Sequence, residues 1–201
     1  MILEVKKRVE RFVQDSGQRD VYAPTVYLAK PNIKLLFPNA VNANFEKHLG
    51  PCASISCSPF LKRLFLSCST DGSVRLYDMS NQRPIMVFEP GYNEYLMKVA
   101  WSPFRPTVFV TVSNAGTVYI YDLILSRQTP SYILGYRPPP GYDAGSSKSA
   151  YTVAFNPVIR DFLAVGYHDG TAKVFQLNYS LSRAKQDEVK MLKSLLEEKD
   201  Q

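Results

Sequence analysis

The chain has 201 residues, of which 45% are hydrophobic and 21% charged, as in an ordinary folded globular protein. No apolar run approaches the roughly 20 residues that a membrane-spanning helix needs, and charges interrupt the apolar residues at the N-terminus, which excludes a secretory signal and argues against a membrane partner. The net charge of +6 is spread along the chain, which argues against direct binding to nucleic acid. Three cysteines are too few for a disulfide framework and favour a reducing compartment.

Residues 1–46 form an N-terminal segment with a pattern of its own. Apolar residues recur at helical spacing over 1–14, which predicts a short helix. The stretches 25–29, 33–37 and 39–46 instead have the apolar, β-forming composition of the units that follow. We interpret them as the remnants of a further, degenerate unit of the same kind.

Three segments after residue 46 repeat one another, and this repetition is the strongest pattern in the sequence. In each segment a proline precedes a glycine by 13 residues, as seen in the pairs Pro59 and Gly72, Pro103 and Gly116, and Pro157 and Gly170. The repeats are offset by 44 and then by 54 residues. The ten extra residues fall within 123–150, whose Pro-, Gly- and Ser-rich composition predicts an exposed loop.

Each repeat predicts four antiparallel strands in about 44 residues. Asp71-Gly72 and Asp169-Gly170 lie between two runs of β-forming residues, which predicts hairpins because glycine accepts a positive φ. Residues 85–88 and 131–134 supply a fourth, outer strand. The expected fold is therefore all-β, with three four-stranded units over residues 47–179.

Residues 180–201 predict a C-terminal amphipathic helix. Ser180 or Ser182 is placed to cap it. Apolar side chains recur on one face of this helix at Leu181, Ala184, Val189, Leu192, Leu195 and Leu196. Two interpretations stay open, because such a helix either packs on the side of the β units or docks a partner.

Four-stranded units of this length resemble the blades of a WD-repeat β-propeller. The family motif places Gly-His before the inner strand, Ser or Thr and Asp around the second turn, and Trp-Asp at the end of the third strand. The first repeat has the following residues at these places: Lys47-His48, Ser67 or Ser69, Asp71 and Tyr77-Asp78. The resemblance implies a buried hydrogen-bond chain through these side chains. The later repeats have lost part of the motif, with Gly91-Tyr92 in place of Gly-His in the second.

Catalytic, cofactor-binding and metal-binding motifs are not evident. The only histidines are His48, which the WD motif explains, and His168, which precedes a turn aspartate. Cys52 and Cys57 lack a second ligand pair at zinc spacing, and cysteines within strands are expected to be small buried residues. We therefore expect neither an enzyme nor a cofactor.

Aromatic residues and an arginine in the turns and loops are candidates for partner binding, because such side chains often anchor interfaces when exposed. They are Phe60, Phe104 and Arg105 after the inner strands, and Tyr92, Tyr95 and Tyr142 in the longer loops.

Two stretches of the sequence are similar to the C-terminal propeller of dynein intermediate chains. They are KHLGPCASISCSPFLKRLFLSCSTDGSVRLYD over 47–78 and VAWSPFRPTVFVTVSNAGTVYIYDL over 99–123. Within that family the sequence looks most like the class of retrograde intraflagellar transport. The resemblance implies a non-catalytic scaffold that binds the tail of the dynein heavy chain and other dynein subunits, located in the cytoplasm, on the cytoskeleton and in the cilium.

A full propeller of that family has about seven blades, so the chain looks like the C-terminal part of a longer protein or a short isoform. The segments that bind light chains lie in a long N-terminal extension, so light-chain binding is not expected here. The alternative is a generic WD-repeat adaptor in another complex.

Overall fold

The computed structural model describes residues 44–135 and 148–197. The helix expected over 1–14 and the strands expected over 25–29 and 33–37 lie outside these residues. Eleven strands and two helices follow one another in the described part. Their bounds are β1 (Cys52–Cys57), β2 (Leu64–Ser69), β3 (Val74–Asp78), β4 (Met86–Phe88), β5 (Leu96–Trp101), β6 (Val108–Ser113), β7 (Val118–Asp122), β8 (Tyr132–Leu134), β9 (Ala150–Phe155), β10 (Phe162–Tyr167), β11 (Ala172–Gln176), α4 (Tyr179–Ser182) and α5 (Glu188–Glu197).

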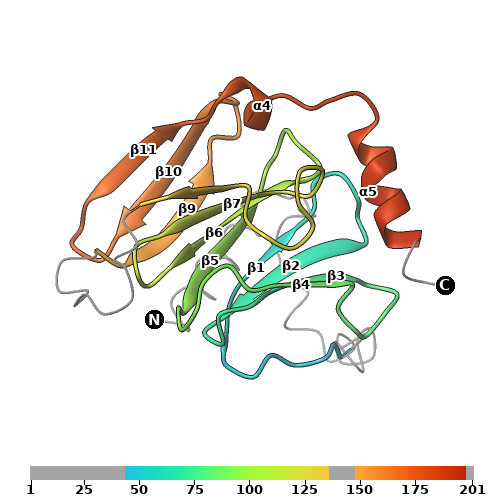
Figure 1. Cartoon of the computed structure of the whole chain (residues 1–201), viewed down its shortest axis with the longest axis horizontal. Helices are drawn as coiled ribbons and strands as arrows, with labels where there is room; N and C mark the ends of the chain where they lie inside the picture. The colour runs from blue at the N-terminus through green and yellow to red at the C-terminus, as the bar shows by residue number, and fades with distance from the viewer. Residues whose placement is uncertain (1–43, 136–147, 198–201) are drawn as a thin grey trace, which may run out of the picture. The chain divides into compact units, whose positions relative to one another are not determined.

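The strands form three antiparallel sheets, which we call the first, second and third blade. The first blade is β1-β2-β3-β4, the second β5-β6-β7-β8 and the third β9-β10-β11. Figure 1 shows the second blade between the other two, and the inner strands β1, β5 and β9 are neighbours in that order. The expected partial WD-type propeller is confirmed.

The third blade has three strands in the part of the chain that the structure describes, one fewer than expected. The reason lies directly after β11, where the side chain of Asn178 accepts a hydrogen bond from the backbone N–H of Leu181 and caps α4. The chain therefore enters α4 within the stretch that, in the other blades, leads from the third strand to the fourth.

Glycine closes the second hairpin of every blade, as the sequence predicts. Gly72, Gly116 and Gly170 have φ values of 83°, 81° and 80°. A Cβ on Gly72 would lie 2.9 Å from the carbonyl oxygen of Glu94, and one on Gly116 would collide with the carbonyl oxygen of Lys148. A Cβ on Gly170 would meet nothing within 4 Å. Each hairpin thus packs against the entry loop of the next blade, except in the third blade, where no described segment covers it.

The alternation of side chains in the second blade separates two hydrophobic cores, because successive residues of a strand point to opposite faces. Phe109, Tyr119 and Tyr121 pack toward the first blade. On the opposite face of the second blade, five aliphatic side chains pack toward the third blade, namely Val108, Val110, Val112, Val118 and Ile120. The second blade is therefore buried on both faces, which explains its near-continuous apolar strands.

A stacked pair of rings with a third ring at its edge occurs twice. In the second blade Phe109 and Tyr121 stack at 4.7 Å between ring centroids, and Phe88 from β4 of the preceding blade meets Phe109 edge-on at 5.1 Å. In the first blade Phe65 and Tyr77 stack at 5.1 Å, and Phe45 meets Phe65 edge-on at 4.9 Å. Phe45 therefore occupies the place that a preceding blade's outer strand fills in the second blade.

The outer faces of the first and third blades carry exposed apolar side chains. Val174 on β11 is 68% exposed, and Tyr151 on β9 and Ile55 on β1 are exposed as well. Cys57 shares this exposure, and the expectation that it is a buried strand residue is wrong, whereas Cys68 is buried against the second blade. The difference arises because no described sheet covers the outer side of β1.

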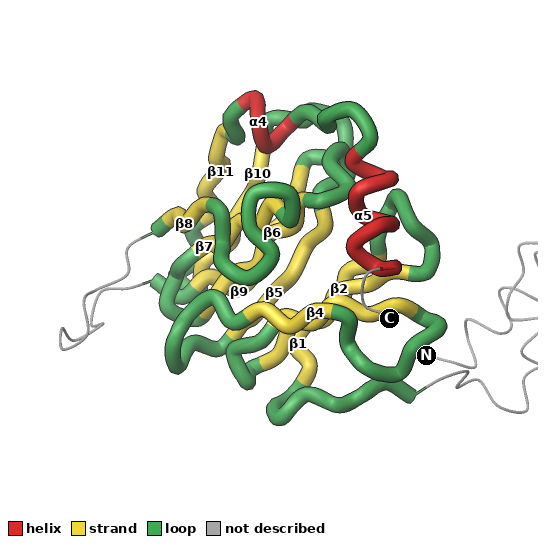
Figure 2. The backbone as a smooth tube through the Cα atoms, turned by 45° about the vertical axis from the view of Figure 1, so that its right-hand side comes forward, coloured by secondary structure: helices red, strands yellow, loops and turns green. Residues whose placement is uncertain are grey.

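The C-terminal segment forms two short helices where one was expected. The helix breaks after Ser182, and Asp187 has a φ of 66°, which no helix interior tolerates. Leu181 on α4 and Leu192 on α5 are buried on the blades, while Ala184 and Val189 are exposed. Figure 2 shows α4 beside the ends of β10 and β11. Neither helix of the described residues is long and apolar enough to cross a membrane.

Candidate functional site

The WD hydrogen-bond chain of the first blade centres on His48. Its Nε2 lies 2.6 Å from the Oγ of Ser67, and its Nδ1 lies 3.1 Å from the Oδ2 of Asp71 and 3.1 Å from the Oγ of Ser73. The backbone N–H of Leu49 donates to the same Asp71 oxygen at 2.9 Å. The loop before β1 is thereby tied to the hairpin between β2 and β3.

Two residues predicted for this chain bind elsewhere. The Oγ of Ser69 accepts a hydrogen bond from the backbone N–H of Asp71 at 3.1 Å, and the hydroxyl of Tyr77 donates to the carbonyl oxygen of Glu46 at 2.7 Å. The hydrogen bonds of the His48 ring go to Ser67, Asp71 and Ser73, and not to Ser69 or Tyr77. Ser73, which the sequence reasoning missed, donates its hydroxyl to Asp71 at 2.7 Å. The signal was the Asp-Gly-Ser order of the turn, since an aspartate readily bonds the residue two positions on.

The electrostatics of this cluster follow from burial and hydrogen bonding. Partial burial alone would raise the pKa of Asp71, but hydrogen bonds from Ser73 and Leu49 and the neighbouring His48 outweigh it and hold that pKa far below its usual range. Burial lowers the pKa of His48 from 6.5, although Asp71 opposes the shift. Asp71 is therefore ionised and the imidazole is neutral at physiological pH.

The second blade replaces this cluster with a different polar pair. Glu94 is buried, and its carboxylate accepts a hydrogen bond from the hydroxyl of Tyr119 at 2.9 Å. The side-chain oxygen of Asn114 accepts from the backbone N–H of Tyr95 at 2.8 Å. Sequence reasoning missed Glu94 because a glutamate in a loop usually faces solvent.

The candidate partner-binding residues divide between the two ends of the blades. Tyr92 and Tyr95, 84% and 56% exposed, lie in the loop before β5, beside the glycine hairpins. Phe60 and Phe104 lie in the turns after β1 and β5, at the opposite end, and are half-buried. Tyr142 lies outside the described residues. The structure thus does not gather these residues into one patch.

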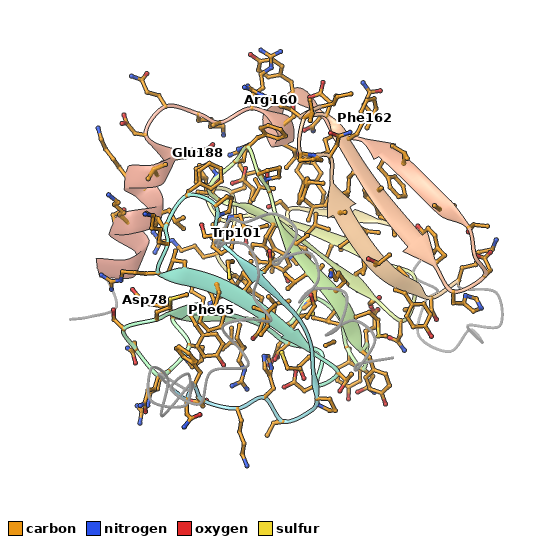
Figure 3. All side chains as sticks on the ribbon, turned by 180° about the vertical axis from the view of Figure 1, so that it is seen from behind. Phe65, Asp78, Trp101, Arg160, Phe162 and Glu188 are labelled. Atoms are coloured by element: carbon orange, nitrogen blue, oxygen red, sulfur yellow. The ribbon has the colours of Figure 1, made fainter. Side chains whose placement is uncertain are left out.

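Arg105 is not the exposed anchor that the sequence predicted, since its side chain is 0% exposed. Its Nη1 lies 2.9 Å from the Oδ2 of Asp122 on β7, and its Nη2 lies 2.5 Å from the Oε1 of Glu188 on α5. The guanidinium also donates to the carbonyl oxygen of Ser180. We call Arg105, Asp122 and Glu188 the buried arginine cluster. Figure 3 shows Glu188 where α5 begins.

This cluster performs the structural task of joining the C-terminal helices to the second blade. Two carboxylates flank one guanidinium, and the hydroxyl of Thr107 adds a hydrogen bond to Asp122 at 3.3 Å. Buried charges are tolerated only when they are paired and hydrogen-bonded in this way. In the first blade Arg63 and Asp78 form a pair at 2.6 Å, but there the arginine side chain is 66% exposed.

Comparison with known families identifies the type of blade. Residues 40–78 match the family model of the WD domain, G-beta repeat. Together with the three successive sheets, this match makes the chain part of a WD-repeat propeller.

The chain is 36% identical to cytoplasmic dynein 2 intermediate chain 2 of Homo sapiens over 134 residues, which are 67% of this chain and 24% of that protein. It is also 36% identical to the Mus musculus protein of the same name over 155 residues, 77% of this chain and 27% of that protein. Cytoplasmic dynein 1 intermediate chain of Drosophila melanogaster is 37% identical over 68 residues, 31% of this chain and 10% of that protein. The chain thus resembles the WD-repeat region of dynein intermediate chains, and it spans about a quarter of the length of the dynein 2 relatives.

Proposed function

We propose that the chain is a non-catalytic scaffold subunit of a dynein motor, which binds the heavy-chain tail through its blades and supports intraflagellar transport. The observation that carries this proposal is the 36% identity to cytoplasmic dynein 2 intermediate chain 2 over 67% of this chain. The similarity extends over 77% of the chain in the mouse protein. A likeness across that share of the sequence points to a shared role for the blades themselves.

The use of the polar side chains supports a scaffold. Both ring nitrogens of His48 are engaged by neighbours within the first blade, and each charged side chain of the buried arginine cluster is paired within that cluster. The His48 side chain is only 6% exposed and Ser67 only 3% exposed, so a substrate would have little access to them, and their hydrogen bonds serve to hold the loop before β1 on the hairpin. A scaffold role also fits the exposed loops at both ends of the blades, because loops held by a rigid sheet are common sites of partner binding.

The proposed location follows from the same relatives. Proteins named as dynein intermediate chains imply a place on the cytoskeleton, and the dynein 2 name suggests the cilium. We propose both for this chain, within the cytoplasm.

The test is isolation of the tagged protein from ciliated cells, followed by mass spectrometry of what accompanies it. We expect the dynein heavy chain and other dynein subunits to be enriched, and deletion of residues 47–177 to abolish that enrichment. A tagged WD-repeat protein unrelated to dynein is the control. Recovery of another complex without any dynein subunit would favour the alternative, a general WD-repeat adaptor.

A further inference from the structure

A groove of about 530 Å³ lies at the end of the second and third blades where α4 packs. Phe104 of the second blade and Arg160 of the third form one side. Tyr179, Arg183 and Lys185 of α4 and the segment after it form the other. Figure 3 shows Arg160 at this end of the third blade.

The lining of the groove is basic and aromatic. Arg160, Arg183 and Lys185 are exposed, and the lining contains no carboxylate. None of the three pairs with an acidic side chain among the residues that the structure describes. A groove with three unneutralised cations is complementary to a negatively charged ligand.

Each arginine of the groove lies over an aromatic ring. The guanidinium carbon of Arg160 is 5.3 Å from the ring centre of Phe104, and that of Arg183 is 4.8 Å from the ring centre of Tyr179. Such cation–π contacts hold the guanidinium planes in place, which favours the bidentate binding of a carboxylate. Tyr179, 73% exposed, also offers an apolar surface beside the charges.

The helix α4, which lines the groove, is held in place by hydrogen bonds with residues outside the groove. Asn178 caps this helix, and the carbonyl oxygen of Ser180 accepts a hydrogen bond from Arg105 of the buried arginine cluster. The groove is therefore preformed, so a ligand loses less free energy in ordering it.

We propose that this groove binds a short acidic segment of a partner protein. Its carboxylates would pair with Arg160, Arg183 and Lys185, and an apolar or aromatic side chain between them would lie on Phe104 and Tyr179. A peptide fits better than a nucleic acid, because three cations in one groove are too few to follow a phosphate backbone and the rest of the positive charge is spread along the chain. The inference stands independently of the dynein proposal.

The experiment measures fluorescence anisotropy of a labelled peptide of alternating Glu and Tyr on the full chain. The same peptide with Gln in place of every Glu is the ligand control. The double variant Arg160→Glu with Arg183→Glu tests the groove. The double variant Lys62→Glu with Arg83→Glu is the matched control, since both residues are exposed outside the groove and the net charge changes equally.

We expect the groove variant to bind the Glu-Tyr peptide at least about tenfold more weakly than the parent does, while the control variant binds it as tightly as the parent. Tyr179→Ala should weaken binding as well, which a purely electrostatic attraction would not require. Equal loss in both double variants, or equal binding of the Gln peptide, would overturn the proposal. Tighter binding of a single-stranded RNA or of anionic vesicles through the same arginines would also overturn it, because the occupant would then be of another class.

Discussion

Removing the guanidinium of Arg105 tests how the C-terminal helices are held. Arg105→Ala leaves the carboxylates of Asp122 and Glu188, which are 2% and 1% exposed, without the cation between them. Removing one partner of a buried ion pair costs about 3–5 kcal/mol. For a chain of this size that loss lowers Tm by roughly 6–20 °C.

Arg63→Ala is the matched control. It removes the arginine from a pair with Asp78 of similar geometry, but the Arg63 side chain is 66% exposed. An exposed pair contributes about 0–1 kcal/mol, so its removal should lower Tm by less than about 4 °C. The difference between the two variants isolates the effect of burial.

The assay is thermal unfolding of both variants followed by circular dichroism under identical conditions. A double variant, Arg105→Ala with Glu188→Ala, should be less destabilised than the sum of the two single variants, because it removes one of the uncompensated charges. Equal shifts of Tm for Arg105→Ala and Arg63→Ala would contradict a special role for the buried arginine cluster. So would strict additivity in the double variant.

The first-blade histidine, the hairpin glycines and the exposed outer faces of the blades can each be tested by one substitution. Burial lowers the pKa of His48 from 6.5, so the unfolded chain takes up a proton on this histidine at a higher pH than the folded chain does. The contribution of neutral His48 to the free energy of unfolding is therefore fully present above pH 6.5 and is lost as the pH falls below 6.5. His48→Gln should remove this part of the pH dependence of Tm. Gly116→Ala should destabilise more than Gly170→Ala in urea unfolding, because both have a positive φ but only the first adds a collision; equal losses would contradict the packing of hairpin on entry loop. The exposed side chains of the first and third blades predict self-association of the isolated chain, which Val174→Lys should reduce on size-exclusion chromatography, whereas a clean monomer of the parent would contradict it.

Most of the fold could be predicted from local sequence patterns. The spacing of prolines and glycines predicted the three hairpins, because a short turn with one position at positive φ leaves glycine as the natural choice. Gly72, Gly116 and Gly170 all have that conformation. The outer strands at 85–88 and 131–134 were also predicted, and β4 and β8 lie there.

Long-range contacts were beyond the reach of those patterns. Arg105 follows a Pro-Phe turn and looks exposed, yet it is buried because Glu188, 83 residues further along the chain, packs over it. The single helix expected over 180–201 is also interrupted: Asp187 has a positive φ, and Glu188 beside it pairs with Arg105. Neither feature leaves a periodic signal.

The candidate site was partly readable. His48 and Asp71 stood out through the WD motif, and the Asp-Gly-Ser order could have revealed Ser73. The groove at α4 was not readable, because Phe104, Arg160 and Arg183 come from three separate turns. Only the packing of the third blade and α4 brings them together.

The measurement that tests the central proposal most directly is binding of the purified chain to a purified dynein heavy-chain tail by biolayer interferometry. We expect saturable binding to the dynein 2 heavy-chain tail, and no binding to an unrelated coiled-coil protein of similar charge. Absence of saturable binding by a chain whose circular dichroism shows folded β structure would contradict it.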